Sequence, residues 1–280
     1  MAQINKSDTK SIPLFKPNEL PQIKKLSAKS LQSHRGLCQV KRSSGIIFCM
    51  KKKSQYHGYR FPTEIISHTV WLYHRFTLSF RDIEDLFAER GIVVTYETIR
   101  QWCQKFGLNY AKKLRKKQGK LGDTWYADEV FLKINGKRQY LWRAVDQDGD
   151  VVDILVQSRR NKKAALRFFR KMLKRQGTPR KIVTDKLRSY GAARKEVMPS
   201  VMHCQDQYAN NRAEGSHQRT RQQERKMRRF KSPGQAQRFL AVHSQVHNLF
   251  RVGRHLLKAR HYRMLRARSF SVWQEVSCAC

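Results

Sequence analysis

The sequence predicts an α/β fold in which an all-α segment precedes a mixed sheet with flanking helices. Over residues 61–107 apolar side chains recur every three or four positions, which is the helical period. Over residues 124–158 the period changes to two, and the hairpin dipeptide Asn135-Gly136 interrupts it. An amphipathic segment at 162–175 and one further short apolar segment follow. The chain therefore changes from helices to a sheet with a crossover helix.

The all-α segment is predicted to contain three helices. The first covers residues 61–76, and the second begins at Ser79, which pairs with Asp82 in a capping-box pattern. The third begins at Thr95 and is expected to end near Gly107, because helices commonly end at glycine. A helix, a short turn and another helix form the helix-turn-helix arrangement of DNA-binding proteins, although a plain helical hairpin has the same pattern.

The charge of the chain favours the DNA-binding interpretation. The 59 Lys and Arg residues exceed the 21 Asp and Glu residues, which gives a formal net charge of +38 among 280 residues. Such a surface attracts phosphate backbones, although a solvated basic surface is the simpler alternative. Residues 57–110 are therefore predicted to be a helix-turn-helix domain that binds double-stranded DNA, with base contacts from Arg100, Gln101 and Gln104.

Basic residues outside this domain are expected to hold DNA phosphates. The run at 111–120 is interpreted as a linker that lies on DNA, with a solvated helix end as the alternative. A second basic stretch covers residues 219–231. The phosphate contacts predicted from the two stretches are Lys112, Lys113, Arg115, Lys116, Lys117, Arg219, Arg221 and Lys226.

The sheet is predicted from four segments. Strands are expected at 124–134, 138–146 and 151–158, and a fourth at 181–184 follows the amphipathic helix. Three antiparallel strands, a helix and another strand are the order of a ribonuclease H-like core. Residues 121–231 are therefore predicted to form a ribonuclease H-like domain, although other mixed folds begin with the same order of elements.

Three carboxylates are candidates for a metal site in this acid-poor chain. Asp128 lies in mid-strand on an apolar face, where an unpaired carboxylate is costly and a bound cation would offset the cost. Asp185 ends a strand, and Glu214 lies near the start of a predicted helix. Such a set fits hard divalent ions, and two metals could stabilise both oxygens of a phosphoryl transfer. The alternative is that each acid forms an ion pair.

Other candidates for the site are weaker. Glu129 is rejected because strand alternation points it to the opposite face, and Asp146 is kept as a weak reserve. His217 is interpreted as a base or a DNA contact, since no second Glu-x-x-His copy accompanies it. Serine-nucleophile and phosphate-loop motifs are absent from the sequence.

The two ends of the chain are interpreted separately. Residues 1–56 are predicted to be a basic, disordered extension. A translation start at Met50 is a further interpretation, and a transit peptide is the weaker alternative. Residues 232–280 are predicted to be helical, beginning at the cap Ser232. The apolar stripe of this region, from Ala236 to Phe250, is assigned to the core, with a dimer surface as the alternative.

Membrane insertion and disulfide bonding are both excluded. No apolar run approaches the roughly 18 residues that a membrane span needs. The six cysteines form no C-x-x-C pair, which indicates free thiols in a reducing compartment. We therefore expect a cytoplasmic, nucleoid-associated protein.

Several motifs resemble one family. They are WYADEVF (125–131), GKRQYLWRAVDQDG (136–149), IVTDKLRSYGAA (182–193) and NNRAEGSHQRTRQQERKMRRFKS (210–232). With the helix-turn-helix pattern at 59–102, they resemble the bacterial DDE transposases of the insertion-sequence-six family. The resemblance covers most of the chain from Tyr59 onwards.

The resemblance implies a function and a set of site residues. Asp128, Asp185 and Glu214 fall on the family's acidic triad, which implies metal binding and catalysis by these three residues. It also implies binding of terminal inverted repeats, Mg²⁺-dependent cleavage exposing a 3′-hydroxyl, strand transfer into target DNA, and cointegrate products. Two Mg²⁺ ions are expected, with Mn²⁺ as a substitute, and synapsis of two ends requires at least a homodimer.

Two departures from the family pattern bear on activity. Gly215 stands where relatives usually have Asn, and Arg221 stands where they often have Lys. The alternatives are therefore an impaired copy that binds the ends as a repressor, a structure-specific ribonuclease H-like nuclease, and a basic RNA-associated structural protein. Cleavage and joining at specific ends would separate the transposase from all three.

Overall fold

The computed structural model describes residues 55–205, 210–253 and 256–278. The predicted extension, except for its last two residues, lies outside this part of the chain. The helices are α1 (Thr63–Arg75), α2 (Phe80–Ala88), α3 (Tyr96–Lys117), α4 (Lys162–Gln176), α5 (Arg188–Val197), α6 (Asn211–Lys226), α7 (Pro233–Phe250) and α8 (Ala259–Cys278). The strands are β1 (Thr124–Ile134), β2 (Lys137–Asp146), β3 (Val151–Gln157), β4 (Lys181–Thr184) and β5 (Met202–Cys204).

Side-chain caps fix the first helices where the sequence predicted them. Ser79 and Asp82 form the expected capping box at the start of α2. The Thr95 hydroxyl accepts a hydrogen bond from the Thr98 amide at the start of α3. Two helices joined by residues 89–95 therefore occupy the predicted helix-turn-helix positions.

The expected end of α3 near Gly107 was wrong, because the helix continues to Lys117. Gly107 lies where α3 approaches other helices, and an added Cβ would meet His74 and Val242 at 3.4 Å. The apolar period continues beyond it, with Tyr110 and Leu114 buried. The glycine allows close helix packing rather than ending the helix. The predicted linker at 111–120 is accordingly helical as far as Lys117.

The sheet is mixed and has the strand order β3-β2-β1-β4-β5. β1, β2 and β3 are antiparallel neighbours, whereas β4 and β5 join parallel to β1. The hairpin turn uses Asn135 and Gly136 at φ values of 49° and 76°, the left-handed backbone that a tight hairpin requires. This topology confirms the predicted ribonuclease H-like core.

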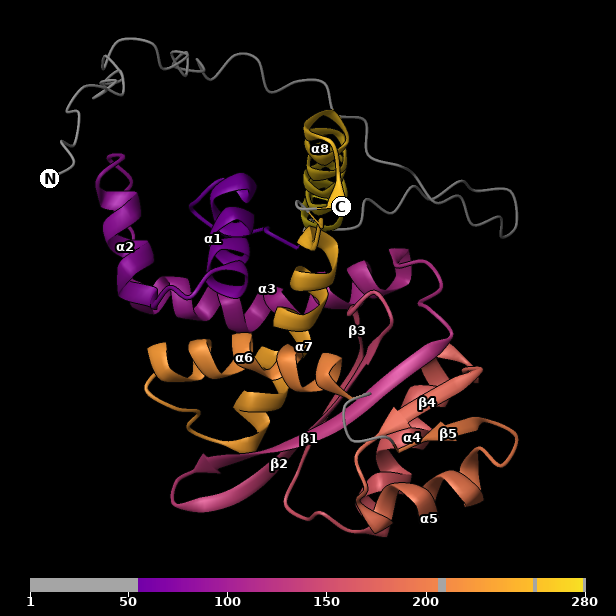
Figure 1. The fold of residues 1–280 in the computed structure, drawn as a ribbon. Helices are drawn as coiled ribbons and strands as arrows, with labels where there is room; N and C mark the ends of the chain where they lie inside the picture. The colour runs from indigo at the N-terminus through magenta and orange to yellow at the C-terminus, as the bar shows by residue number, and fades with distance from the viewer. Residues whose placement is uncertain (1–54, 206–209, 254–255, 279–280) are drawn as a thin grey trace, which may run out of the picture. The chain divides into compact units, whose positions relative to one another are not determined.

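Helices cover both faces of the sheet (Figure 1). One face, which includes Trp142, packs against the apolar sides of α4 and α5. The other face, which includes Leu132 and Leu141, packs against α7, and α6 lies beside β1 and β2. The active-site candidates on β1 therefore lie between two helical layers.

Helix α7 joins the N-terminal helices to the sheet. It contacts α1, α3 and β3, and it begins at the predicted cap Ser232. Its apolar stripe is buried, including Ala236, Leu240 and Val246, which confirms the core assignment. The described residues accordingly form one compact unit with a continuous core.

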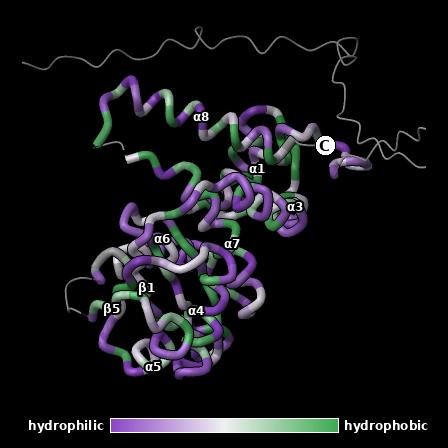
Figure 2. Tube along the Cα trace, turned by 90° about the vertical axis from the view of Figure 1, so that its right-hand side faces the viewer, coloured by the Kyte–Doolittle hydropathy of each residue, from purple (hydrophilic) through white to green (hydrophobic). Residues whose placement is uncertain are grey.

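The C-terminal helix α8 packs on the N-terminal helices. Trp273 and Val276 are buried in the shared core, and Trp273 makes an edge contact with Tyr110 of α3. Hydrophilic and hydrophobic residues alternate along α8 in Figure 2, which is typical of a helix with one buried side. Among the described helices, none is long and apolar enough to cross a membrane.

Buried histidines predict a loss of stability in acid. Burial lowers the pKa of His74 to about 4, although its Nδ1 contacts the Val70 carbonyl oxygen at 2.8 Å. Below about pH 6.5 His74 binds a proton in the unfolded chain but stays neutral in the folded protein until about pH 4. The free energy of unfolding should therefore fall by about 1.4 kcal/mol per pH unit from this residue between pH 6.5 and 4.

Chemical denaturation of wild type and His74→Gln at pH 4–7 measures this contribution. The variant should have a shallower dependence on pH, whereas His57→Gln, at an exposed histidine, should keep the wild-type slope. Equal slopes for His74→Gln and wild type would contradict the assignment.

Candidate active site

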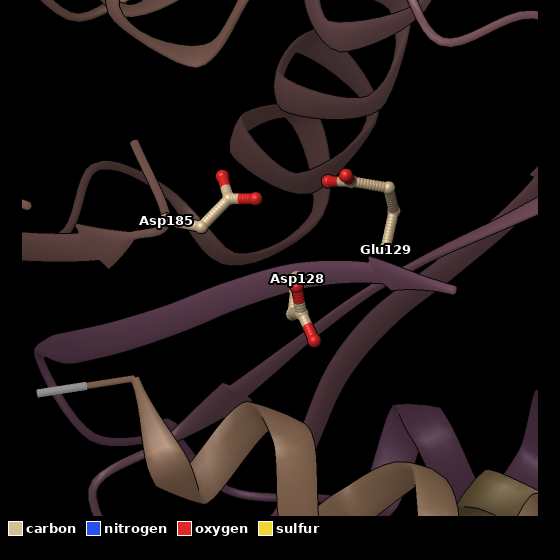
Figure 3. A group of neighbouring side chains, drawn as sticks. All are labelled: Asp128, Glu129 and Asp185. Carbon is tan, nitrogen blue, oxygen red and sulfur yellow. The ribbon is translucent and has the colours of Figure 1, made fainter. Parts of the chain in front are cut away.

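Two of the predicted carboxylates lie together at the centre of the sheet. Thr184 of β4 is the register partner of Ala127 of β1, so Asp185 follows β4 beside Asp128. Oxygen atoms of Asp128, Glu129 and Asp185 all lie within 4.8 Å of one another. Figure 3 shows the Glu129 and Asp185 side chains extending toward each other, with Asp128 on the other side of the strand.

Glu129, which the sequence analysis rejected, is grouped with Asp128 and Asp185 in the structure. Strand alternation does send Glu129 to the face opposite Asp128, as expected. Asp185, however, lies one residue beyond the end of β4, and one of its carboxylate oxygens lies within 4.8 Å of an oxygen of each of the other two acids. The signal in the sequence was the consecutive acids Asp128 and Glu129 within a strand of an acid-poor chain.

Arg160 bridges two of these carboxylates. Its Nε donates to Glu129 Oε1 at 2.5 Å, and its NH2 atom lies 3.5 Å from Asp185 Oδ2. The Glu129 side chain is only 2% exposed, and burial raises its pKa to about 7. The charges of Asp185 and Asp128 raise this pKa further, whereas the Tyr190 hydroxyl and Arg160 lower it. The negative charges at this position repel one another.

A histidine of helix α6, His217, contacts Asp128. His217 Nε2 lies 3.5 Å from Asp128 Oδ2, and the imidazole is buried. Burial, with the charges of Arg143 and Arg221, holds the pKa of His217 well below its usual value, so the ring is neutral. Glu214 lies one turn earlier on α6, and residues three apart share a helix face. The Glu214 side chain itself lies outside the described part of the structure.

The reserve candidate Asp146 has a structural task. Its Oδ1 accepts hydrogen bonds from the amides of Asp148 and Asp150, and its Oδ2 accepts one from Gly122. This carboxylate therefore holds the turn between β2 and β3 and the segment that enters β1.

The clustered carboxylates fit a divalent cation. Hard cations take oxygen ligands, and oxygen atoms from three acids lie close enough to share one ion. A cation would also offset the repulsion that raises the pKa of Glu129. Among the described residues, the group whose oxygen atoms lie together consists of three carboxylates, which is the chemistry of Mg²⁺ or Mn²⁺ sites rather than of structural zinc.

The predicted base-contacting residues lie at the start of α3. Arg100 donates to both Glu97 oxygens, at 2.8 and 2.5 Å, and Gln101 donates to Glu97 at 3.2 Å. These bonds lower the pKa of Glu97 to about 2. Arg100 and Gln104 line a cavity of about 370 Å³ whose other walls include α7. Base contacts from Arg100 would require it to leave Glu97.

The predicted phosphate contacts on α3 divide into three groups. Lys113 donates to the Val276 carbonyl at 2.9 Å and Lys117 pairs with Glu275, so both contact α8. Arg115 is partly buried near Asp153 and Arg175, and burial lowers its pKa. Lys112 and Lys116 are exposed.

The three predicted contacts on α6 face different neighbours. Arg219 lies 3.2 Å from His247 Nδ1, and Arg221 donates to the Phe131 carbonyl at 2.6 Å and to Glu224 at 3.0 Å. Lys226 pairs with Asp82 of α2 at 2.9 Å. The C-terminal end of α6 thus contacts both β1 and the N-terminal helices.

Gly215 in α6 offers a test of local stability. An added Cβ would meet nothing within 4 Å, so alanine fits without a clash. Gly215→Ala should raise the free energy of unfolding by about 0.5–1 kcal/mol, because glycine loses more backbone freedom in a helix. Denaturant titration measures the change. Gly91→Ala should instead destabilise, since Gly91 has a φ of 69°; gains in both variants would contradict the argument.

Comparisons with known proteins agree with the geometry. A family model described as a DDE domain matches residues 122–253, which include Asp128, Asp185 and Glu214. The transposase of insertion sequence-like element IS431mec from Staphylococcus aureus (strain Mu50) is 34% identical over 163 residues, which are 56% of this chain and 73% of that protein. The transposase of insertion sequence IS257 in transposon Tn4003, also from S. aureus, is 32% identical over the same shares.

A partial likeness to solved structures accompanies these matches. The catalytic core domain of BIV integrase aligns with a TM-score of 0.31 and 14% identity, over 54% of this chain and 98% of that chain. The sequence matches are the stronger finding, because a relative above 30% identity is matched over most of its length. They confirm the resemblance stated from the motifs. The protein is a transposase and a polynucleotidyl transferase that acts on DNA, and the chain belongs to the insertion-sequence-six family of DDE transposases.

Proposed function

We propose that Asp128, Asp185 and Glu214 are the catalytic metal ligands of this transposase. The observation that carries the proposal is the meeting of Asp128 and Asp185 where β1 and β4 pair. Asp128 also contacts His217 of α6, the helix that bears Glu214. The ions are Mg²⁺, two per site, with Mn²⁺ as a substitute. When bound, they would activate a water or a 3′-hydroxyl and stabilise the leaving oxygen.

The residues around the triad then have separate tasks. Asp128 and Asp185 would hold the metal ions that contact the reacting phosphate. Both residues lie where β1 pairs with β4. His217, neutral and buried, orients Asp128 from α6. Arg160 and Glu129 hold Asp185 from the other face of β1.

The remaining parts of the chain bind and align DNA. Residues 57–110 bind the terminal inverted repeats through Arg100, Gln101 and Gln104, and residues 111–120 guide the DNA toward the catalytic domain at 121–231. Lys112, Lys116, Arg219, Arg221 and Lys226 hold phosphates. Two such chains, with their 232–280 regions, join two ends and insert them into target DNA as a cointegrate, in the bacterial cytoplasm at the nucleoid.

Metal removal tests the proposed chemistry directly. Purified protein with a duplex that carries the element's own end should cut it with Mg²⁺, exposing a 3′-hydroxyl, and should stop when EDTA is added. Mn²⁺ should restore cutting, because it accepts the same oxygen ligands. The measurement is the cleaved fraction on a denaturing gel.

The controls separate the proposed function from its alternatives. A duplex with a scrambled end should remain uncut by the transposase. A structure-specific nuclease would instead cut both duplexes. Binding of the end without cutting in any metal would contradict the proposal and indicate a repressor.

A further inference from the structure

A second polar cavity lies beside α6 and is lined by Gly215, Ser216 and Arg219 of that helix. It has a volume of about 210 Å³ and lies between the β2–β3 turn, α6 and α7. Three arginines and two histidines line it. They come from β2, α6, α7 and the residue that follows α7, and are Arg143, Arg219, His243, His247 and Arg251. The described residues of its lining include no acid, and the Asp150 carboxylate lies 3.7 Å from Arg251. The cavity is therefore strongly cationic.

Two buried polar groups in this cavity lack hydrogen-bond partners. Arg143 is 3% exposed; its terminal nitrogens donate to the Ser216 carbonyl and the Thr220 hydroxyl, but its Nε has no partner in the described part of the chain. Ser244 Oγ is also buried without a partner among the described residues. Buried donors left unsatisfied are costly, so a ligand with acceptor oxygens would stabilise this wall.

The histidine arrangement shows the same excess of positive charge. His247 Nδ1 lies 2.9 Å from an Arg75 guanidinium nitrogen and 3.2 Å from one of Arg219. A ring nitrogen that accepts from two guanidinium groups carries no proton. Burial, and then the charges of His243, Arg75 and Arg219, hold the pKa of His247 far below its usual value. Arg75 and Arg219 thus lie close together, with the neutral ring of His247 between them.

We propose that this cavity binds a phosphate group, supplied by the backbone of the DNA on which the transposase acts. Guanidinium groups are suited to phosphate oxygens because they donate in a planar fork, and Arg219 and Arg251 are exposed at the mouth of the cavity. The assignment of the phosphate to DNA rests on the proposed function. The inference that the cavity binds an oxyanion does not depend on it.

The cavity is linked to the catalytic carboxylates through the sheet. Arg143 on β2 is the register partner of Asp128 on β1, and directly paired residues of antiparallel strands share a face. Gly215 and Ser216, which line the cavity, follow Glu214 in α6. A DNA phosphate bound here would lie beside the catalytic site and fix the strand relative to Asp128.

Titration calorimetry of the full-length protein with inorganic phosphate, at constant ionic strength, tests the cavity itself. Wild type should show one saturable site. Arg219→Gln/Arg251→Gln should weaken phosphate binding at least about tenfold, because two charged donors are lost. Arg260→Gln/Arg263→Gln removes the same charge from exposed positions on α8 and should bind as wild type does. No saturation, or equal weakening in both double variants, would overturn the proposal.

The source of the phosphate is tested by repeating the titration on the complex with a terminal-repeat duplex. Loss of the inorganic phosphate site in the complex would support occupation by the DNA backbone. Unchanged phosphate binding in the complex would overturn the DNA source and assign the site to a free oxyanion. If the protein failed to bind the duplex, the proposed function would fail, while the first titration would still decide the cavity.

Discussion

Asp128→Asn is expected to abolish cointegrate formation. The substitution keeps the size of the side chain but removes the charge, so β1 should remain in register with β2 and β4. A carboxylate that holds a divalent ion contributes several kcal/mol to stabilising charge in the transition state. A loss of about 4 kcal/mol corresponds to about a thousandfold lower rate.

A plasmid assay in cells measures this effect. The protein is supplied in trans to a donor plasmid that carries the element's own ends, and cointegrates with a recipient plasmid are counted. Wild type should give cointegrates, and both Asp128→Asn and Asp185→Asn should reduce their number at least about a thousandfold. Binding of the end duplex by the purified variants should stay within a few-fold of wild type, since Asp128 and Asp185 lie outside the predicted DNA-binding helices.

A matched control separates catalysis from general charge effects. Asp148→Asn makes the same change at an exposed turn of the same sheet. The Asp148 backbone amide, not its side chain, contacts Asp146. This variant should transpose as wild type does. Equal cointegrate counts for Asp128→Asn and wild type would refute the assignment of Asp128 to the metal site.

Sequence periodicity was sufficient to predict the position of Asp128 and Asp185. The strands 124–134 and 181–184 have the bounds predicted from alternation and length, because their side chains alternate between two apolar layers. Once β1 and β4 are parallel neighbours, Asp128 and Asp185 must lie together. Local patterns also predicted the caps at Ser79, Thr95 and Ser232, since a cap depends on only a few consecutive residues.

Features that depend on distant contacts were not predictable in this way. The continuation of α3 through Gly107 depends on how closely His74 and Val242 approach from other helices. The cationic cavity joins residues of β2, α6 and α7 that have no common pattern in the sequence. The place of Glu129 in the carboxylate cluster depends on Asp185 extending past the end of β4.

Glu129→Gln provides the sharper test of how the cluster works. We expect Glu129 to act on the metal site through Arg160 and Asp185, because it is buried, lies on the opposite face from Asp128 and is bound by Arg160 at 2.5 Å. Groups that orient metal ligands typically change metal affinity about 10–100-fold when they are mutated. Gln keeps an oxygen for Arg160 but removes the charge that attracts a cation.

The measurement is strand transfer in vitro as a function of Mg²⁺ concentration. For Glu129→Gln the half-maximal Mg²⁺ concentration should rise about tenfold or more, and activity at saturating Mg²⁺ should return to near the wild-type level. Asp128→Asn should not be rescued by Mg²⁺, because a direct ligand is missing. Glu196→Gln, at an exposed acid that pairs with Lys162 and Arg170, should leave the Mg²⁺ dependence unchanged.

The pattern of rescue discriminates between three arrangements of the same carboxylates. Rescue of Glu129→Gln by Mg²⁺ would place Glu129 outside the ligand set and favour Glu214 as the third ligand. Complete loss without rescue would make Glu129 a direct ligand, which the 4.8 Å grouping with Asp128 and Asp185 allows. No change at any Mg²⁺ concentration would reduce Glu129 to the counter-ion of Arg160.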